Sequence, residues 1–317
     1  MLLLILFIAL ESVPWCNACL ACGGGLGFPI PCAFQARSKS NENGSIPCSN
    51  GKFCPAPGIL PVAEANGTDI NRTEIVALAQ ISFKIYHVTN ADATNSFLVA
   101  IEPELNTMGI VTLSTDKSTI ISVFRGTNLV AANEVSFDFA NVIEDFIALL
   151  VDSPLCIECN VHLGFLEAYS SIADQMKANV KSLQSSFPNA SKLVATGHSM
   201  GGAMATLFAL DLIVNEGMNN ISLVTFGSPR VGNVAFSQFA NLRLGSTNWR
   251  VTYDNDMVTV FPLMAMGYKH VGAEVHYVPS GDGQYFLLPT GLDVDYSRTS
   301  ISDHFGYSNM SLTSQMP

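Results

Sequence analysis

The sequence is poor in charge, and poorest in positive charge. Only 13% of its 317 residues are charged, and 15 Lys and Arg stand against 26 Asp and Glu, for a formal net charge of −11. Nucleic-acid binding needs a basic surface, so this class of function is excluded. Intrinsic disorder is excluded too, because it needs low hydrophobicity and 48% of the residues are hydrophobic.

Long hydrophobic runs are also missing. The longest, residues 2–10 (LLLILFIAL), is too short to span a bilayer, so no transmembrane segment is expected. It has the length of a signal-peptide core, and Pro14 and small residues up to Ala18 follow it. We interpret residues 1–18 as a signal peptide and the protein as secreted. No Lys or Arg precedes the run, and a buried N-terminal strand or helix is the alternative.

Cysteine is unevenly distributed along the chain. Of the eight cysteines, those at positions 16 to 54 crowd the N-terminal segment, and Cys156 and Cys159 stand apart. In a secreted chain such clusters predict disulfides, and the N-terminal spacing matches no zinc-binding pattern. Cys156 and Cys159 either form a local disulfide or bind separately to the N-terminal cluster. Cleavage after Ala18 leaves an odd number of cysteines.

Sequons for N-glycosylation also favour export and predict a glycoprotein. They begin at Asn43, Asn66, Asn71, Asn189, Asn220 and Asn309.

The chain has two compositionally different parts. Residues 19–61 are rich in Gly, Pro, Ser, Asn and Cys, which predicts a cysteine-rich N-terminal segment held by cross-links. Residues 62–317 form one domain, in which helical spacing over residues 73–88 precedes strands and alternating helices. Further helices are expected at residues 165–183, 200–215 and 234–242, and strands at residues 97–101, 108–113, 119–124, 192–196, 221–226 and 249–253. The alternation predicts an α/β fold with a central, mostly parallel sheet flanked by helices.

The stretch KLVATGHSMGGA contains the pattern Gly197-x-Ser199-x-Gly201 between a strand and a helix. This context is typical of a nucleophile elbow, whose tight turn strains the serine backbone and leaves no room for Cβ atoms at the glycines. The Met200 amide and the helix dipole would then face a developing oxyanion. We interpret His198 as a packing residue, because the turn points its ring away. An ordinary glycine-rich turn is the alternative reading.

A serine nucleophile needs a base and an orienting acid, which follow it in the order acid, then histidine, in α/β-hydrolases. His270 and His276 lie in KHVGAEVHYV, whose alternation predicts a strand and structural roles. His304 lies in a predicted loop, where a mobile base belongs, and is the candidate base. Asp254 and Asp256 both follow a predicted strand, and periodicity does not choose between them.

Seven short motifs in series resemble the signatures of the class 3 lipases, the family of the filamentous-fungal triacylglycerol lipases. They lie within residues 73–307 and read VFRGT, VHLGFLEAY, ATGHSMGGAMATL, TFGSPRVGN, DNDMVTVFP, HVGAEV and DHFGY. The resemblance implies an α/β-hydrolase fold. It also selects Asp256 over Asp254 as the acid, implies His304 as the base, and adds Thr127 to Met200 as a second oxyanion donor.

The sequence departs from the family pattern at several positions. Met200 replaces the commoner Leu, which leaves the backbone donor intact, and Thr259 stands where the family often has Pro. Residues 128–151 are strongly apolar but lack the Trp that is usual in the family's lid. We predict a mobile lid there, with a fixed core helix as the alternative.

The resulting hypothesis is a secreted serine ester hydrolase that acts on lipid esters, in the first place triacylglycerols, through Ser199, Asp256 and His304. Its expected partner is a lipid ester at a lipid–water interface, and no metal or organic cofactor is implied. A phospholipase or an aryl-ester (feruloyl-type) esterase on the same fold is one alternative. A non-catalytic lipid-binding or cell-surface protein is the other.

Overall fold

The computed structural model describes residues 60–61, 72–127, 149–278, 285–293 and 298–309. The chain divides into two compact units, one of residues 1–68 with 286–288 and one of the remaining residues. In the first unit, β1 (Leu60–Pro61) pairs antiparallel with residues of β13 (Tyr285–Leu288). The predicted signal peptide and the cysteine-rich segment up to residue 59 lie outside the described residues, and the domain boundaries stay predictions.

A mostly parallel sheet forms the centre of the second unit. Its described strands are β2 (Phe97–Glu102), β3 (Thr107–Leu113), β4 (Thr119–Phe124), β7 (Lys192–His198), β8 (Ile221–Phe226), β10 (Asn248–Tyr253) and β12 (Ala273–Tyr277). They lie in the order β12-β10-β8-β7-β4-β3-β2, with β4 to β12 parallel and β3 antiparallel to both of its neighbours. The carboxyl ends of the parallel strands therefore share one edge of the sheet, where ligand sites of such folds lie.

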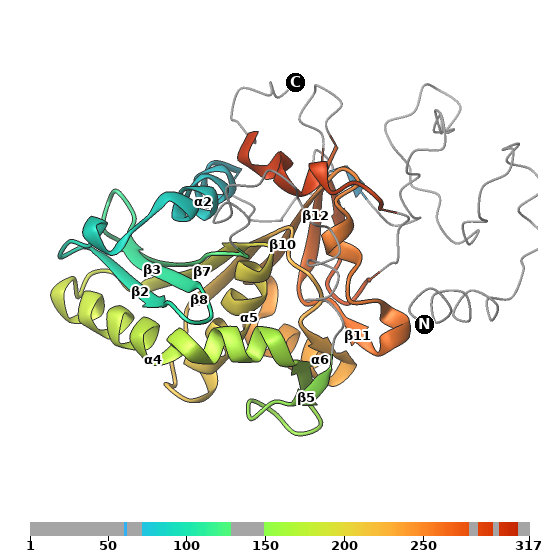
Figure 1. Ribbon diagram of the computed structural model, residues 1–317, viewed down its shortest axis with the longest axis horizontal. Coiled ribbons are helices and arrows are strands. Elements are labelled where there is room, and N and C mark those ends of the chain that lie inside the picture. Colours follow the sequence, from blue (N-terminus) through green and yellow to red (C-terminus); the bar gives the residue numbers. More distant parts are fainter. Residues whose placement is uncertain (1–59, 62–71, 128–148, 279–284, 294–297, 310–317) are drawn as a thin grey trace, which may run out of the picture. The chain divides into compact units, whose positions relative to one another are not determined.

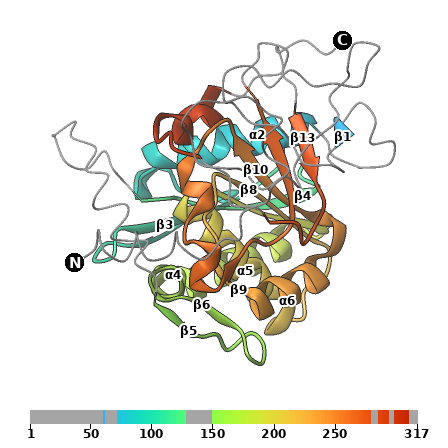
Figure 2. The same ribbon diagram turned by 90° about the vertical axis from the view of Figure 1, so that its right-hand side faces the viewer.

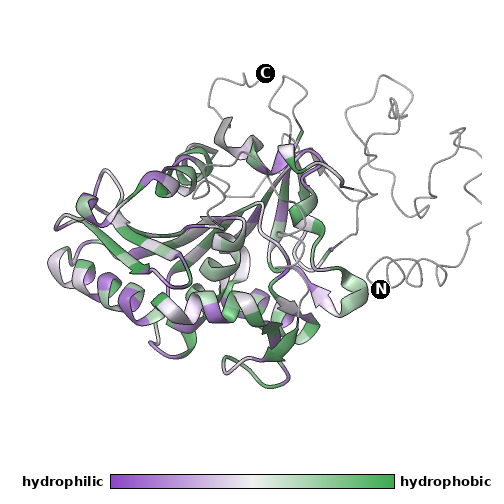
Figure 3. Cartoon of the chain, in the orientation of Figure 1, coloured by the Kyte–Doolittle hydropathy of each residue, from purple (hydrophilic) through white to green (hydrophobic). Residues whose placement is uncertain are grey.

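Helices cover both faces of this sheet. Figures 1 and 2 show α2 (Arg72–Lys84) on one side and α4 (Leu163–Ser186), α5 (Met200–Val214) and α6 (Val234–Leu244) on the other. α5 is buried all round, as an apolar interior helix should be. α4 alternates hydrophilic and hydrophobic residues along its length (Figure 3) and buries the face with Phe165, Tyr169, Ile172 and Met176. This architecture confirms the predicted fold class.

The predicted helices and strands are confirmed with small differences in their bounds. The helix expected at residues 73–88 ends at Lys84 and continues as the 3₁₀ turn η3 (Ile85–His87). The strand expected around KHVGAEVHYV is only partly right, because His270 lies between β11 (Tyr268–Lys269) and β12. Gly272 with φ 82° turns the chain there, and an added Cβ would meet Asn248 Oδ1 at 2.6 Å.

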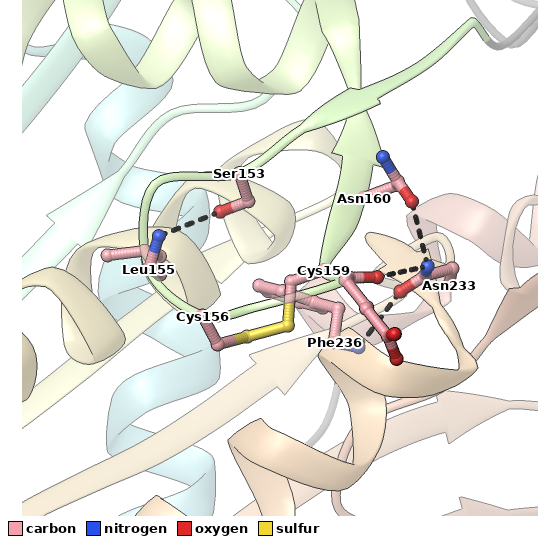
Figure 4. Close-up of a disulfide and its surroundings, with 8 residues drawn as sticks. Ser153, Leu155, Cys156, Cys159, Asn160, Asn233 and Phe236 are labelled. Carbon is pink, nitrogen blue, oxygen red and sulfur yellow. Dashed lines mark hydrogen bonds between the residues drawn. A yellow bond between two sulfur atoms is a disulfide. The ribbon is translucent and has the colours of Figure 1, made fainter.

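The disulfide lies in a connection between two strands of a small antiparallel sheet. The strands of this sheet lie in the order β11-β9-β6-β5, with β9 at Gly232–Asn233, β6 at Asn160–His162 and β5 at Leu150–Asp152. Cys156 and Cys159 are bonded to each other in the β5–β6 connection, with a Cα–Cα distance of 5.4 Å (Figure 4). Of the two predicted pairings, the local one is therefore confirmed.

The predicted lid lies almost wholly outside the described residues. Only residues 149–151 are described, and Leu150 and Val151 belong to β5. The lid therefore stays a prediction. Among the helices of the described ranges, none combines the length and the apolar character needed to cross a bilayer.

Candidate active site

Ser199 occupies a strained turn at the carboxyl end of β7. Its φ is 60° and its ψ −132°, and α5 begins at the next residue. A Cβ at Gly197 would lie 2.4 Å from the Gly201 carbonyl group, and one at Gly201 only 2.1 Å from Phe124 O. The backbone strain and the need for both glycines, which the sequence predicts for an elbow, are confirmed.

Asp256 and His304 are in contact at the same edge of the sheet. His304 Nδ1 lies 3.0 Å from both carboxylate oxygens of Asp256, which is fully buried after β10. The carboxylate also accepts hydrogen bonds from Val258 N at 2.9 Å and from Tyr307 Oη at 2.6 Å. Asp254 instead donates its N–H to Tyr277 O. Periodicity did not choose between Asp254 and Asp256, and in the structure it is Asp256 that contacts His304.

His304 lies in a 3₁₀ helix, η8 (Ser302–Asn309), rather than in the predicted loop. Figures 1 and 2 show this red helix on the same side of the sheet as α2. A Cβ at Gly227, just past β8, would lie 2.9 Å from Asp256 Oδ2 and 3.0 Å from His304 Cε1. Only a glycine at the end of β8 leaves room for this pair.

His198 connects the elbow to His304. Its buried ring lies 4.4 Å from those of Phe83 and His304, so the predicted packing role is confirmed. In addition, its Nε2 lies 2.7 Å from His304 O and its Nδ1 3.1 Å from Tyr86 Oη. Burial, followed by the nearby His304, holds the pKa of His198 well below its ordinary value. A neutral ring therefore donates to the His304 carbonyl and accepts from Tyr86.

The two expected oxyanion donors lie beside each other. Thr127 Oγ1 is 3.9 Å from Met200 Sδ, and Met200 is the first residue of α5. A Cβ at Gly126 would come within 3.0 Å of Ser199 Cβ, so the segment after β4 lies directly against the elbow. Backbone amides at this helix start are placed where negative charge is stabilised.

His270 and His276 have internal partners, as their predicted structural roles require. His270 Nε2 lies 2.7 Å from Thr259 O, and His276 Nδ1 lies 2.8 Å from Thr252 Oγ1. Both rings are buried. Burial, followed by the charge of Arg298, lowers the pKa of His276 to about 3, so its ring is neutral at pH 7.

Tyr307 and Tyr86 are site residues to which the sequence analysis gave no role. Tyr307 Oη donates to Asp256 and accepts from Tyr253 N at 3.0 Å. Burial and the adjacent Asp256 raise the pKa of Tyr307 well above its ordinary value, so the hydroxyl stays a donor. The only signal for Tyr307 was its position in the DHFGY motif. Within the described part of the chain, no group of three or more His, Cys, Asp or Glu could hold a metal ion.

Comparison with known sequences finds a likeness to lipases over part of the chain. The family model Lipase (class 3) matches residues 121–266. The secreted mono- and diacylglycerol lipase A of Penicillium cyclopium is 32% identical over 169 residues, which are 53% of this chain and 51% of that protein. The secreted mono- and diacylglycerol lipase 1 of Fusarium solani is 34% identical over 201 residues, 63% of this chain and 53% of that protein. The chain thus spans about half the length of the curated relatives it matches.

Solved structures extend the likeness over most of the chain. Lipase II from Rhizopus niveus superposes with a TM-score of 0.68 at 26% identity, covering 81% of this chain and 99% of that one. The native Rhizomucor miehei lipase propeptide complex superposes with a TM-score of 0.64 at 27% identity, covering 78% of this chain and 82% of that one.

The elbow at the carboxyl edge of a mostly parallel sheet, together with this likeness, makes the second unit an α/β-hydrolase fold. More narrowly, residues 121–266 match the class 3 lipase family, and the secreted lipases of Penicillium and Fusarium resemble this chain over about half of their length.

Proposed function

We propose that this protein is a secreted serine ester hydrolase that cleaves acylglycerols. The contact between His304 and Asp256, at the same end of the sheet as the strained turn of Ser199, is the observation that carries the proposal. The names of the Penicillium and Fusarium relatives, which are mono- and diacylglycerol lipases, favour acylglycerols over phospholipids and aryl esters. A further solved structure, 27% identical to this chain, is that of a triacylglycerol lipase whose catalytic centre is a serine protease triad.

The reaction proceeds by acyl transfer through Ser199. His304 removes the hydroxyl proton as the oxygen attacks the ester carbonyl, and returns it to the leaving alcohol. Asp256 accepts from His304 Nδ1, which fixes the tautomer and stabilises the imidazolium. Backbone amides of Met200 and Thr127, with the Thr127 hydroxyl, bind the oxyanion. Water then hydrolyses the acyl-enzyme by the same steps in reverse order.

Export is the second part of the proposal. The relatives from Penicillium and Fusarium are named as secreted, and an oxidising compartment suits the Cys156–Cys159 disulfide. Asn189 and Asn220 of the predicted sequons are exposed, as glycan attachment requires.

Covalent labelling tests the nucleophile directly. We expect the wild type to react with an alkyl fluorophosphonate and the Ser199→Ala variant to stay unlabelled. The melting temperature of Ser199→Ala should equal that of the wild type. Ser228→Ala is the matched control, because Ser228 follows β8 and donates only to Pro229 O at 3.1 Å. Labelling of a folded Ser199→Ala protein would remove Ser199 as the nucleophile. A folded wild type that stays unlabelled would favour the non-catalytic lipid-binding alternative.

A substrate panel tests the choice of ester. Mono-, di- and triacylglycerols of one acyl chain are compared with phosphatidylcholine and methyl ferulate. We expect faster turnover of the acylglycerols. A preference for phosphatidylcholine or for methyl ferulate would replace the proposed substrate with one of the two alternative esters while leaving the mechanism in place.

A further inference from the structure

The segment that carries Asp256 has little regular structure of its own. Residues 254–262, which we call the acid loop, contain only the one-turn 3₁₀ helix η6 (Met257–Val260). Yet the carboxylate of Asp256 must stay aligned with His304 Nδ1 to be useful. Side chains from elsewhere in the chain hold the loop. His270 Nε2 lies 2.7 Å from Thr259 O, and Arg230 Nη1 donates to Pro262 O at 3.0 Å.

Thr259 is the side chain of the acid loop that bonds to Asp256 itself. Its Oγ1 donates to the main-chain oxygen of Asp256 at 2.8 Å and accepts from Arg298 Nη1 at 2.6 Å. The residue is 1% exposed, so water does not substitute for either bond. A proline, common at this position in the family the sequence resembles, could make neither bond. The Thr259 contacts are therefore a feature of this chain.

Arg298 connects Thr259 to a buried charged group. Its Nη2 donates to Glu274 Oε1 at 2.6 Å, and Glu274 also accepts from Thr252 Oγ1 at 2.6 Å and from Arg250 Nη2 at 3.2 Å. Burial alone would raise the pKa of Glu274, but Arg250 and Arg298 hold it well below its ordinary value. Glu274 is therefore ionised. Its negative charge fixes one side of the Arg298 guanidinium, and the other side of the guanidinium donates to Thr259.

Such a buried ion pair is a poor device for stability alone. Removing charges from water costs several kcal/mol per ion, and apolar side chains of similar size often stabilise as well or better. It does fix geometry, because a planar guanidinium with two bound groups has one orientation. Main-chain bonds also tie the segment of Arg298 to the acid loop, since Ser300 N donates to Asn255 O at 2.9 Å and Met257 N to Ser300 O at 3.2 Å.

We propose that Thr259 and Arg298 are positioning residues of the catalytic acid: the Glu274-bound Arg298 orients the Thr259 hydroxyl, which holds the Asp256 main chain so that its carboxylate meets His304. This inference rests on the proposed Ser199–His304–Asp256 triad. The two residues touch neither substrate nor the reacting atoms, and they act only through Asp256.

Thr259→Val tests the proposal, because it removes the hydroxyl and keeps the shape. We expect kcat on p-nitrophenyl butyrate to fall about tenfold to a hundredfold with KM unchanged, the cost of a misplaced catalytic group. The acid limb of the pH–rate profile should move to lower pH, because a poorly aligned carboxylate stabilises the imidazolium less. Thr259→Ser keeps the hydroxyl and should stay within about twofold of the wild type.

Thr206→Val is the matched control. Thr206 is 2% exposed and its Oγ1 donates to a backbone carbonyl, Gly202 O, at 2.9 Å, as Thr259 does in the acid loop. We expect a comparable loss of melting temperature without a change in kcat or in the pH profile. A purely structural role of Thr259 would give Thr259→Val this same behaviour and would overturn the proposal, as would a Thr259→Ser protein no better than Thr259→Val.

A double-mutant cycle tests whether Arg298 acts through Thr259. Arg298→Lys keeps the charge but cannot donate to Thr259 and Glu274 from one planar group. Alone it should lower kcat severalfold, and on the Thr259→Val background it should cost nothing further. Fully additive losses would mean that Arg298 acts by another route, which contradicts the proposal.

A readout that needs no turnover separates this proposal from the proposed function. The His304 Nδ1 proton that bridges to Asp256 is followed as a low-field proton resonance in the folded protein. It should be present in the wild type and in Thr259→Ser, and shifted or lost in Thr259→Val. A wild type without any esterase activity would remove the proposed function. An unchanged resonance in Thr259→Val would remove the positioning role.

Discussion

The elbow of Ser199 and the acid loop with η8 meet at one edge of the sheet, but they are built in different ways. The elbow is a short uninterrupted stretch between β7 and the largely buried α5, and glycines make its turn possible. Asp256 and His304 lie in segments of 3₁₀ and irregular structure 48 residues apart, and buried polar side chains hold them. Local sterics thus define one half of the site, and long-range hydrogen bonds the other.

The largest effect is expected when the two histidines His304 and His270 of the second half are replaced, one at a time, by alanine. His304→Ala should lower turnover by several orders of magnitude, because the members of the proposed triad would act as a unit. His270→Ala removes a bond to Thr259 O and should mainly lower the melting temperature. Kinetics on p-nitrophenyl butyrate and thermal unfolding of both variants give the answer. A folded His270→Ala protein without activity, beside an active His304→Ala protein, would show that the base is misassigned.

The second test addresses the sterics of the elbow. In Gly201→Ala the added Cβ would lie 2.1 Å from Phe124 O, and this backbone atom cannot move without disturbing β4. We expect a loss of about 3 kcal/mol or more in the free energy of unfolding, measured with urea. The control is Gly217→Ala, where φ is 63° but no atom lies within 4 Å, so only about 1 kcal/mol is lost. Equal losses in the two variants would contradict a steric role.

The smallest expected effect, taken per pH unit, is a pH dependence of stability that arises mostly in the second half. Burial, followed by the charge of Arg250, holds the pKa of His270 well below its ordinary value. Burial, followed by the charge of Arg298, lowers the pKa of His276 to about 3. Below about pH 6.5 the unfolded chain binds protons that the folded protein does not, so stability falls as the pH drops. Each histidine contributes at most about 1.4 kcal/mol per pH unit.

Urea unfolding between pH 7 and pH 4 measures this slope. His276→Gln removes one titrating ring, and its unfolding free energy should vary less steeply with pH than that of the wild type, whatever its absolute stability. A wild-type stability that does not change over this range would contradict the neutral, buried state of these rings.

The elements that the sequence predicted well are those with local signals. β7, the turn at Ser199 and α5 follow one another in a single stretch, and α4 has an apolar face at helical spacing. The prediction that His270 lies in a strand was wrong. The alternation in KHVGAEVHYV continues across Gly272, but the positive φ of this glycine breaks the strand. Alternation reports which side chains are buried but not where the backbone turns.

The polar contacts of the second half had no such signal. Arg230 and Asp293 form a buried pair with an Nη2–Oδ1 distance of 2.9 Å although they lie 63 residues apart. Neither residue belongs to a periodic pattern that would predict the pairing. For Thr259 the sequence showed only a departure from a family pattern, and its two bonds became visible once β10, β12 and the segment of Arg298 were placed in space.

The sequence separation of the two halves also has a consequence for biosynthesis. A nascent chain that has reached α5 already contains the turn of Ser199, whereas η8, which carries His304, is made about 100 residues later. At ribosomal rates of about 5–20 residues per second, this delay is on the order of ten seconds. η8 must then dock against α2, which is translated long before the elbow. During that interval the growing chain holds the proposed nucleophile without its proposed base, so the proposed ester hydrolysis cannot begin before synthesis has passed η8.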